Sequence, residues 1–469
     1  MWRKNEAMNL KPVTHNLWNF LSKMKRPPNI LFLMDDQHHF DWFGFAGHPI
    51  AKTPNLDRIA RDGVVFENAY TPAPMCIPAR QCMASGKFPR SCGVEQFGED
   101  LPPNSETFAR ALARGGYHTA CAGKLHHAGI DQMQGWSHRI CNGDDMKVHA
   151  EYIEGRDEAA WEQFAKHPGM WSLSKELQKA GAGRSPYAAS DELNTAGACA
   201  LIEEYFVSPQ YERATPERPL LLKLSLQQPH YPFCAPAEMV ERYLPLVEEY
   251  DNQHCLEHPE FANWTHDPEE VSKEDRLRAI AATAAMVELC DGYFGQVLDQ
   301  LEACGQDLDD WLILYTSDHG EMLGEHGKWW KMSFYEGSVK VPLIMRAPKL
   351  FEGGGRSVSE NVNLCDFFAT FCDVAGLPLP KETDSRSLLP LLRGEAADWP
   401  DESVSQYRGE FLMIKCGALK YQYYGDNPDW PEVLFDLDAD PGETRNLASA
   451  PDYAACLSDF QLRKSELGF

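Results

Sequence analysis

Short, unbroken runs of apolar residues recur along the chain. They fall at 29–34, 218–226, 310–318 and 341–348, and each has the length of a strand. Runs that are apolar at successive rather than alternate positions are typical of strands buried on both faces of a parallel sheet. The first run ends in Asp35-Asp36 and the third in Asp318-His319, so two predicted strands carry polar groups at the same end.

Helix signals lie between these runs. Thr53 and Pro54 suit a cap and a first helical position, and Gly63 ends that segment. Ser105 is expected to cap a second helix that stops at 115–116, and residues 273–301 have the pattern of a long amphipathic helix. Strands that alternate with helices predict an α/β fold with a large, mostly parallel sheet sandwiched by helices.

The pattern of apolar and polar residues changes at both ends of the sequence. Residues 1–26 are polar and lack a strong pattern, so we treat them as an N-terminal extension. After residue 376 a connection rich in Pro and Leu leads to short alternating strands, a turn and a final helix. We therefore expect a large α/β domain at 27–376 and a small C-terminal α+β subdomain at 377–469.

Composition narrows the class of protein. The 469 residues are 43% hydrophobic and 24% charged, as in a globular protein with a core. The 44 Lys and Arg against 70 Asp and Glu give a formal charge of −26. Because such a surface repels nucleic acid and anionic membrane, neither is an expected partner. The 14 scattered cysteines, without paired CxxC elements, an apolar leader or a transmembrane run, predict reduced thiols and a cytoplasmic protein.

The acidic strand ends are the first candidate site. Parallel sheets bind ligands beyond the carboxyl ends of their strands, so Asp35, Asp36, Asp318 and His319 are expected at one edge. Each pair alone fits a solvated turn or a helix cap equally well. Together, three carboxylates and one imidazole suit a divalent metal ion.

Other motifs are weak singly but follow one another in a definite order. Residues 76–80 read CIPAR, 123–126 read GKLH, 227–233 read QQPHYPF, and Lys331 lies thirteen residues after Asp318. Taken one at a time, Cys76 could be a buried thiol beside a rigid turn, and His126 or its neighbour His127 a surface histidine. Lys328 competes with Lys331 for the same role.

These motifs, in this order, are part of a larger set that resembles a known family. The rest of the set is NILFLMDD, KTPNLDRIARDG, TSDHGEMLGEHGKWWK, YEGSVKVPLI and FDLDADPGETRNLA. The chain resembles the formylglycine-dependent (type I) sulfatases of the alkaline-phosphatase superfamily over roughly residues 27–450. It looks most like the choline-sulfatase branch and related bacterial members. The resemblance implies an alkaline-phosphatase-like fold and hydrolysis of a sulfate monoester to an alcohol and inorganic sulfate.

The resemblance also implies roles for particular residues. Cys76 would be oxidised by a separate formylglycine-generating enzyme to an aldehyde that hydrates to a gem-diol, and Arg80 would hold that side chain. The metal would be bound by Asp35, Asp36, Asp318, His319 and the modified Cys76. Calcium is the first expectation. The imidazole of His319, where many relatives carry Asn, leaves manganese or zinc open.

The remaining expected residues handle charge and protons. Lys124 and Lys331 would contact sulfate oxygens, His126 would hydrogen-bond the diol, and His230 would stand by the leaving oxygen. Cations and a metal stabilise the charge of a sulfate ester in a site shielded from water, and a histidine can protonate a leaving alkoxide.

Two other functions stay open at this point. A hydrolase of phosphonate monoesters or phosphodiesters would use the same residues, and a catalytically silent binding protein would keep only the fold. The organic part of a small sulfated substrate is not encoded in any motif, since specificity lies in loops such as 94–104, 129–190 and 234–275. Candidates for stacking on a sugar or caging a quaternary ammonium are Trp136, Trp161, Trp171 and Trp264, with core packing as the alternative. A homo-oligomer is also left open.

Overall fold

The structure is a computed structural model that describes residues 27–140, 172–207, 218–252, 256–263, 265–351 and 354–469. The N-terminal extension expected at 1–26 lies outside the described residues, as do Trp161, Trp171 and Trp264.

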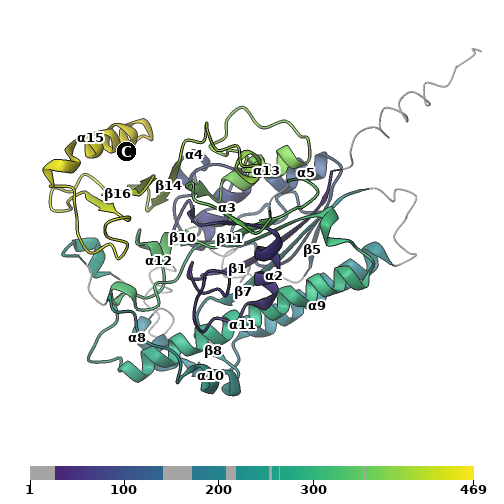
Figure 1. Cartoon of the computed structure of the whole chain (residues 1–469), viewed down its shortest axis with the longest axis horizontal. Coiled ribbons are helices and arrows are strands. Elements are labelled where there is room, and N and C mark those ends of the chain that lie inside the picture. Colours follow the sequence, from purple (N-terminus) through teal and green to yellow (C-terminus); the bar gives the residue numbers. More distant parts are fainter. Residues whose placement is uncertain (1–26, 141–171, 208–217, 253–255, 264, 352–353) are drawn as a thin grey trace, which may run out of the picture.

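A twisted eight-stranded sheet forms the centre of the molecule (Figure 1). All neighbouring strands pair in parallel except β11, which runs antiparallel to both of its neighbours. In spatial order the strands are β12 (Arg356–Val358), β2 (Val64–Phe66), β11 (Leu343–Arg346), β9 (Trp311–Ser317), β1 (Asn29–Asp36), β7 (Leu220–Pro229), β4 (His118–Gly123) and β5 (His138–Ile140). The expected α/β class with a mostly parallel sheet is confirmed.

Helices cover both faces of this sheet. One face packs against α2 (Pro54–Asp62), α9 (Pro186–Phe206) and α11 (Lys273–Ala303). The other packs against α3 (Cys76–Ser85), α5 (Phe108–Arg114), α13 (Asp366–Val374) and α14 (Leu389–Leu392). The shorter helices are α4 (Pro89–Cys92), α8 (Leu173–Gln178), α10 (Ala237–Tyr243) and the fully buried α12 (Glu336–Val339). Small sheets join β3 (Ala69–Tyr70) with β10 (Lys340–Val341) and β13 (Val362–Asn363), and β6 (Gly181–Ala182) with β8 (Cys234–Ala235).

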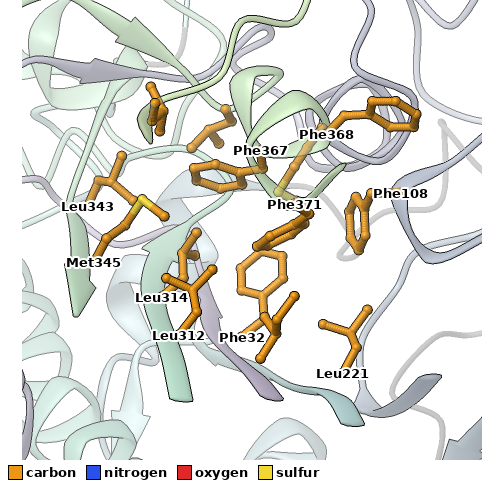
Figure 2. Packing of buried hydrophobic residues seen from close by; sticks show 14 of the residues in the cluster. Phe32, Phe108, Leu221, Leu312, Leu314, Leu343, Met345, Phe367, Phe368 and Phe371 are labelled. Carbon is orange, nitrogen blue, oxygen red and sulfur yellow. The ribbon is translucent and has the colours of Figure 1, made fainter. Parts of the chain in front are cut away.

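Strand alternation divides the core into two layers. Along β1, Leu31 and Leu33 pack toward α9 and α11, whereas Phe32 packs toward α5 and α13. Figure 2 shows the second layer, where the rings of Phe32 and Phe367 meet edge to face at 5.8 Å between centroids. Because both faces of β1 are buried, its sequence is a continuous apolar run rather than an alternating one.

Two local predictions are corrected. The helix after residue 105 begins at Phe108, and its cap is Thr107, whose side chain accepts the backbone N–H of Arg110, rather than Ser105. The run at 341–348 forms β11, which is antiparallel to β9 although it was grouped with the parallel strands. Between β9 and β11 the only α-helix is the four-residue α12, and a parallel return needs a longer crossover.

The C-terminal part is a separate antiparallel layer. It consists of β14 (Glu402–Tyr407), β15 (Phe411–Cys416), β16 (Leu419–Tyr424), β17 (Val433–Asp436) and the helix α15 (Ala454–Glu466), drawn in yellow-green and yellow in Figure 1. This is the α+β arrangement expected there. The domain boundaries at 26/27 and 376/377 stay predictions. Within the described residues, no helix has the length and apolar character needed to cross a membrane.

A buried ion cluster joins this layer to the catalytic part. The ammonium of Lys420, on β16, is fully buried, lies 2.8 Å from Oε1 of Glu336 on α12, and also contacts Glu443. The backbone N–H of Glu336 donates to Oε2 of Glu443 at 2.7 Å. Removing one partner of such a cluster leaves the other charges buried without compensation.

We therefore expect Lys420→Met to lower the free energy of unfolding by about 3–5 kcal/mol. Urea unfolding followed by tryptophan fluorescence measures this. Lys349→Met is the matched control, since Lys349 pairs with two exposed carboxylates and such pairs contribute little. Equal losses of stability in the two variants would contradict the account.

Candidate active site

The polar strand ends meet at one edge of the main sheet, as expected. Asp36 ends β1, Asp318 and His319 directly follow β9, and the neighbouring strands β4 and β7 lead into Lys124 and His230. Close approach of the backbone requires glycine at two of these ends. A Cβ at Gly123 would lie 2.0 Å from the carbonyl oxygen of Ser225, and one at Gly320 would lie 2.0 Å from that of Gly337.

Four side chains at this edge have the composition of a metal site. One ligand atom each from Asp36, Cys76, Asp318 and His319 falls within 4.8 Å of the others, and all four residues are buried. His319 Nδ1 lies 3.0 Å from the carbonyl oxygen of Gly320, so Nδ1 carries a hydrogen, and Nε2 is the ring nitrogen that faces the group. The donor set therefore fits a divalent cation.

Asp35, the fifth expected ligand, lies outside this group. Its Oδ1 is nevertheless buried and has no hydrogen-bond partner among the described residues, so this oxygen stays available to a cation. Oδ2 of Asp35 accepts the Tyr315 hydroxyl at 2.8 Å and contacts His38 Nδ1 at 2.7 Å. The role of Asp35 as a metal ligand therefore stays a prediction.

Arg80 is the cation that holds the two acidic ends together. Its Nε donates to Asp318 at 2.7 Å and its Nη2 to Asp36 at 2.8 Å, and all three groups are buried. Lys124 adds a second cation, with Nζ 2.8 Å from the same Asp36 oxygen. Burial alone would raise the pKa of Asp36, but Lys124 and Arg80 hold it well below its usual range.

Cys76 opens helix α3 and points into the group. Its Sγ lies 3.0 Å from Nε2 of His319 and 3.8 Å from Oδ1 of Asp36. Burial and Asp36 act to raise the pKa of the thiol, but Lys331, Lys124 and His319 outweigh them, so the pKa is lowered. A helix N-terminus also favours negative charge, so this position suits an anionic nucleophile.

Lys331 and His230 form a pair beside Cys76. Lys331 Nζ lies 2.9 Å from His230 Nε2, and His230 Nδ1 lies 2.6 Å from the carbonyl oxygen of Tyr231. Nδ1 is therefore the donor and Nε2 accepts from the ammonium. Burial and Lys331 hold the pKa of His230 well below its usual range, so the ring is neutral in this state.

Two pairs of residues competed for one role each in the sequence, and the structure gives the members of each pair different contacts. Lys328 donates to the carbonyl oxygens of Phe261 and Asn263, whereas Lys331 reaches the group at the sheet edge. His127 Nδ1 contacts the carbonyl oxygen of Gln132, and its pKa is lowered to about 3 by burial. His126 adopts a φ of 60° and meets the ring of Phe97 edge to face at 5.7 Å. Its role beside the nucleophile stays a prediction.

The structure adds residues that the sequence did not single out. Gln37 accepts a hydrogen bond from Lys331, and its backbone N–H donates to Asp318 at 3.2 Å. Ser225 accepts from Arg80 at 2.9 Å, and Tyr187 meets the ring of His230 edge to face. Of these residues, only Gln37 could have been suspected from the sequence, because it directly follows Asp35-Asp36. Trp136, by contrast, packs in the core against Phe108.

Chemically, this edge combines a cation-binding group, an activated side chain and three buried cations. Such a site can bind a tetrahedral oxyanion and stabilise charge that develops on it. The neutral imidazole next to an ammonium can pass a proton. These are the requirements for hydrolysing a sulfate or related ester.

Comparison with known proteins agrees with this chemistry. Residues 28–377 match the sulfatase family, and residues 324–467 match the C-terminal part of N-sulphoglucosamine sulphohydrolase. The chain is 30% identical to a choline-sulfatase of Rhizobium meliloti over 448 residues, which span 90% of this chain and 83% of the relative. It is 28% identical to an N-acetylglucosamine-6-O-sulfatase of Bacteroides thetaiotaomicron, over 91% of this chain and 84% of the relative.

The fold has matches among solved structures. A phosphonate monoester hydrolase of Agrobacterium radiobacter superposes with a TM-score of 0.72 at 26% identity, covering 94% of this chain and 95% of that one. The family match extends over most of the chain, and the two relatives above are sulfatases of which the match covers more than four fifths. The chain therefore belongs to the sulfatase family, whose members are sulfuric ester hydrolases.

Proposed function

We propose that this sulfuric ester hydrolase acts through Cys76 after its conversion to formylglycine. The observation that carries the proposal is the position of Cys76 Sγ, 3.0 Å from His319 Nε2 at the start of a helix and among buried cations. Hydrated formylglycine supplies a nucleophilic oxygen and a second hydroxyl that can expel sulfate. A separate formylglycine-generating enzyme is the partner needed for this maturation.

The metal in this proposal is one divalent ion, calcium first, with manganese or zinc as alternatives. Asp36, Asp318, His319 and the modified residue 76 would hold it, and Asp35 remains a predicted ligand without a contact to them. A bound cation lowers the pKa of an oxygen nucleophile and offsets negative charge. His319 fits this task because its Nδ1–H is already committed to Gly320.

The cations of the chain bind the sulfate group. Lys124 and Lys331 flank residue 76 and would contact sulfate oxygens, while Arg80 stays engaged with both acids. Because these groups are buried and already oriented, they need no reorganisation when charge develops in the transition state. His126 would hydrogen-bond the hydrated residue 76.

Proton supply to the leaving oxygen comes from His230 and Lys331 acting together. His230 Nε2 accepts from the ammonium and the ring hydrogen on Nδ1 is donated to Tyr231, so Nε2 by itself carries no proton to give. A proton of Lys331 shared with Nε2 can move to the leaving oxygen, and the pair then regains a proton from water. This keeps His230 in its expected place and adds Lys331 as the source of the proton.

A phosphonate monoester or phosphodiester hydrolase is the second candidate, favoured by the structural match to such an enzyme at 26% identity. Rates on matched aryl sulfate and aryl phosphonate esters distinguish the two. The choline-sulfatase and N-acetylglucosamine-6-O-sulfatase relatives make choline sulfate and sulfated amino sugars the first substrates to screen. The cytoplasmic location expected from the sequence is part of this proposal.

We expect Cys76→Ala and Cys76→Ser to lose essentially all turnover while keeping the fold. Serine lacks the second hydroxyl that expels sulfate. The measurement is hydrolysis of 4-nitrophenyl sulfate by protein produced together with a formylglycine-generating enzyme. Cys82→Ser, on the same helix, is the matched control and keeps its activity. Turnover by Cys76→Ser near the parent rate would refute the proposed nucleophile.

The proton-donor role predicts a dependence on the leaving group. General acid catalysis contributes about 10²–10⁴-fold, so His230→Ala should slow alkyl or sugar sulfates by that range. It should slow 4-nitrophenyl sulfate much less, since nitrophenolate leaves readily as an anion. His126→Ala is the comparison variant, and it should slow both substrate types alike. Equal losses on the two substrates for His230→Ala would assign this residue to sulfate binding instead.

A further inference from the structure

A buried carboxylate with no expected role lies next to the site. Glu321 follows the Asp318-His319-Gly320 turn and is almost completely buried. Its Oε1 accepts the backbone N–H groups of Leu323 at 3.1 Å and Trp330 at 2.5 Å, and its Oε2 accepts Nε2 of Gln37. Both oxygens are thus used to hold other parts of the chain.

The two backbone donors stand at the ends of one loop. Leu323 and Trp330 both adopt the left-handed region, with φ of 47° and 68°, which is costly for residues with a branched or bulky side chain. The loop is closed further by Met322 N–H to the carbonyl oxygen of Trp330 at 2.7 Å. Lys331 is the next residue, so Glu321 holds the backbone from which Lys331 projects.

Gln37 connects the same carboxylate to the ammonium of Lys331. A carboxylate only accepts and an ammonium only donates, so a single orientation of the Gln37 amide satisfies both. Nε2 donates to Glu321, which leaves Oε1 to accept from Lys331 Nζ. Gln37 itself has a φ of 62°, so its backbone also adopts a costly conformation.

We propose that Glu321 is a positioning residue that sets the place and direction of the Lys331 ammonium, through the loop on one side and the Gln37 amide on the other. The amide separates the carboxylate from the ammonium. A direct ion pair would neutralise Lys331, whereas the interposed amide orients it and leaves its charge for a bound anion. This inference rests on the proposed role of Lys331 in binding the sulfate group.

A double-mutant cycle tests the inference. Glu321→Gln replaces one acceptor oxygen by a donor, which then faces another N–H. A displacement of about 1 Å costs up to about 100-fold in rate, so Glu321→Gln should lower kcat/KM for 4-nitrophenyl sulfate by about 10–100-fold. In the Lys331→Ala background the same substitution should lower it by less than about threefold, since a residue that acts through Lys331 has nothing left to position.

Controls separate positioning from folding and metal binding. The metal content of Glu321→Gln should match that of the parent, and its thermal unfolding should stay cooperative, with a lower midpoint because a buried N–H loses its acceptor. Glu325→Gln, in the same loop, should keep parental kcat/KM. Gln37→Leu removes the amide between Glu321 and Lys331 and leaves Glu321 with its two backbone donors. This substitution should lower kcat/KM in the parent but not in the Lys331→Ala background. If Glu321→Gln fails to fold, Gln37→Leu takes its place in the double-mutant cycle with Lys331→Ala.

The outcomes distinguish the inference from the function on which it rests. Equal losses of kcat/KM from Glu321→Gln in the parent and in Lys331→Ala would overturn the positioning role while leaving the sulfatase mechanism intact. If Lys331→Ala alone left kcat/KM unchanged, the role of Lys331 would be wrong and the inference would fall with it. Loss of bound metal in Gln37→Leu would also overturn the inference, because the effect would then pass through the cation site.

Discussion

The buried guanidinium of Arg80 between Asp36 and Asp318 is the contact on which the site depends. It joins helix α3 to the ends of two neighbouring strands, with bonds of 2.7 and 2.8 Å to the acids. Two carboxylates at this depth cannot both stay ionised without compensation. Arg80, bound to both acids, and Lys124, bound to Asp36, match their charge, and the donor group at this edge would hold a divalent cation in addition.

The same contact fixes the nucleophile. Cys76 is four residues before Arg80 and so lies one helical turn away on the same face of α3. Anchoring Arg80 to the sheet therefore places Cys76 against His319. Lys331 lies on the segment that leads into α12, where Glu336 contacts Lys420 and Glu443 of the C-terminal part. The active site thus depends on packing from both parts of the chain.

Much of this arrangement could be predicted from the sequence. The apolar runs predicted the strands β1, β7 and β9. The residues that the fold brings to one edge were predicted from the motifs at 76–80, 123–126 and 318–331. Contacts that depend on the direction of a side chain or on the conformation of a loop could not be predicted from the sequence. The contacts of Asp35 with Tyr315 and His38, and of Asp36 with Arg80 and Lys124, are not indicated by the sequence, in which the two acids look equivalent. Glu321 acts through Leu323 and Trp330, whose left-handed backbone no sequence pattern indicates. The antiparallel β11 was missed because its apolar run resembles that of a parallel strand.

The central claim is that the acids and imidazole at this edge bind one divalent cation that the catalytic residue needs. Elemental analysis of the purified parent and of Asp318→Asn tests it most directly. The account predicts one divalent ion per chain in the parent and far less in the variant, because a neutral amide is a poorer ligand, with sulfatase activity lost in parallel. Stoichiometric metal and parental activity in Asp318→Asn would contradict it.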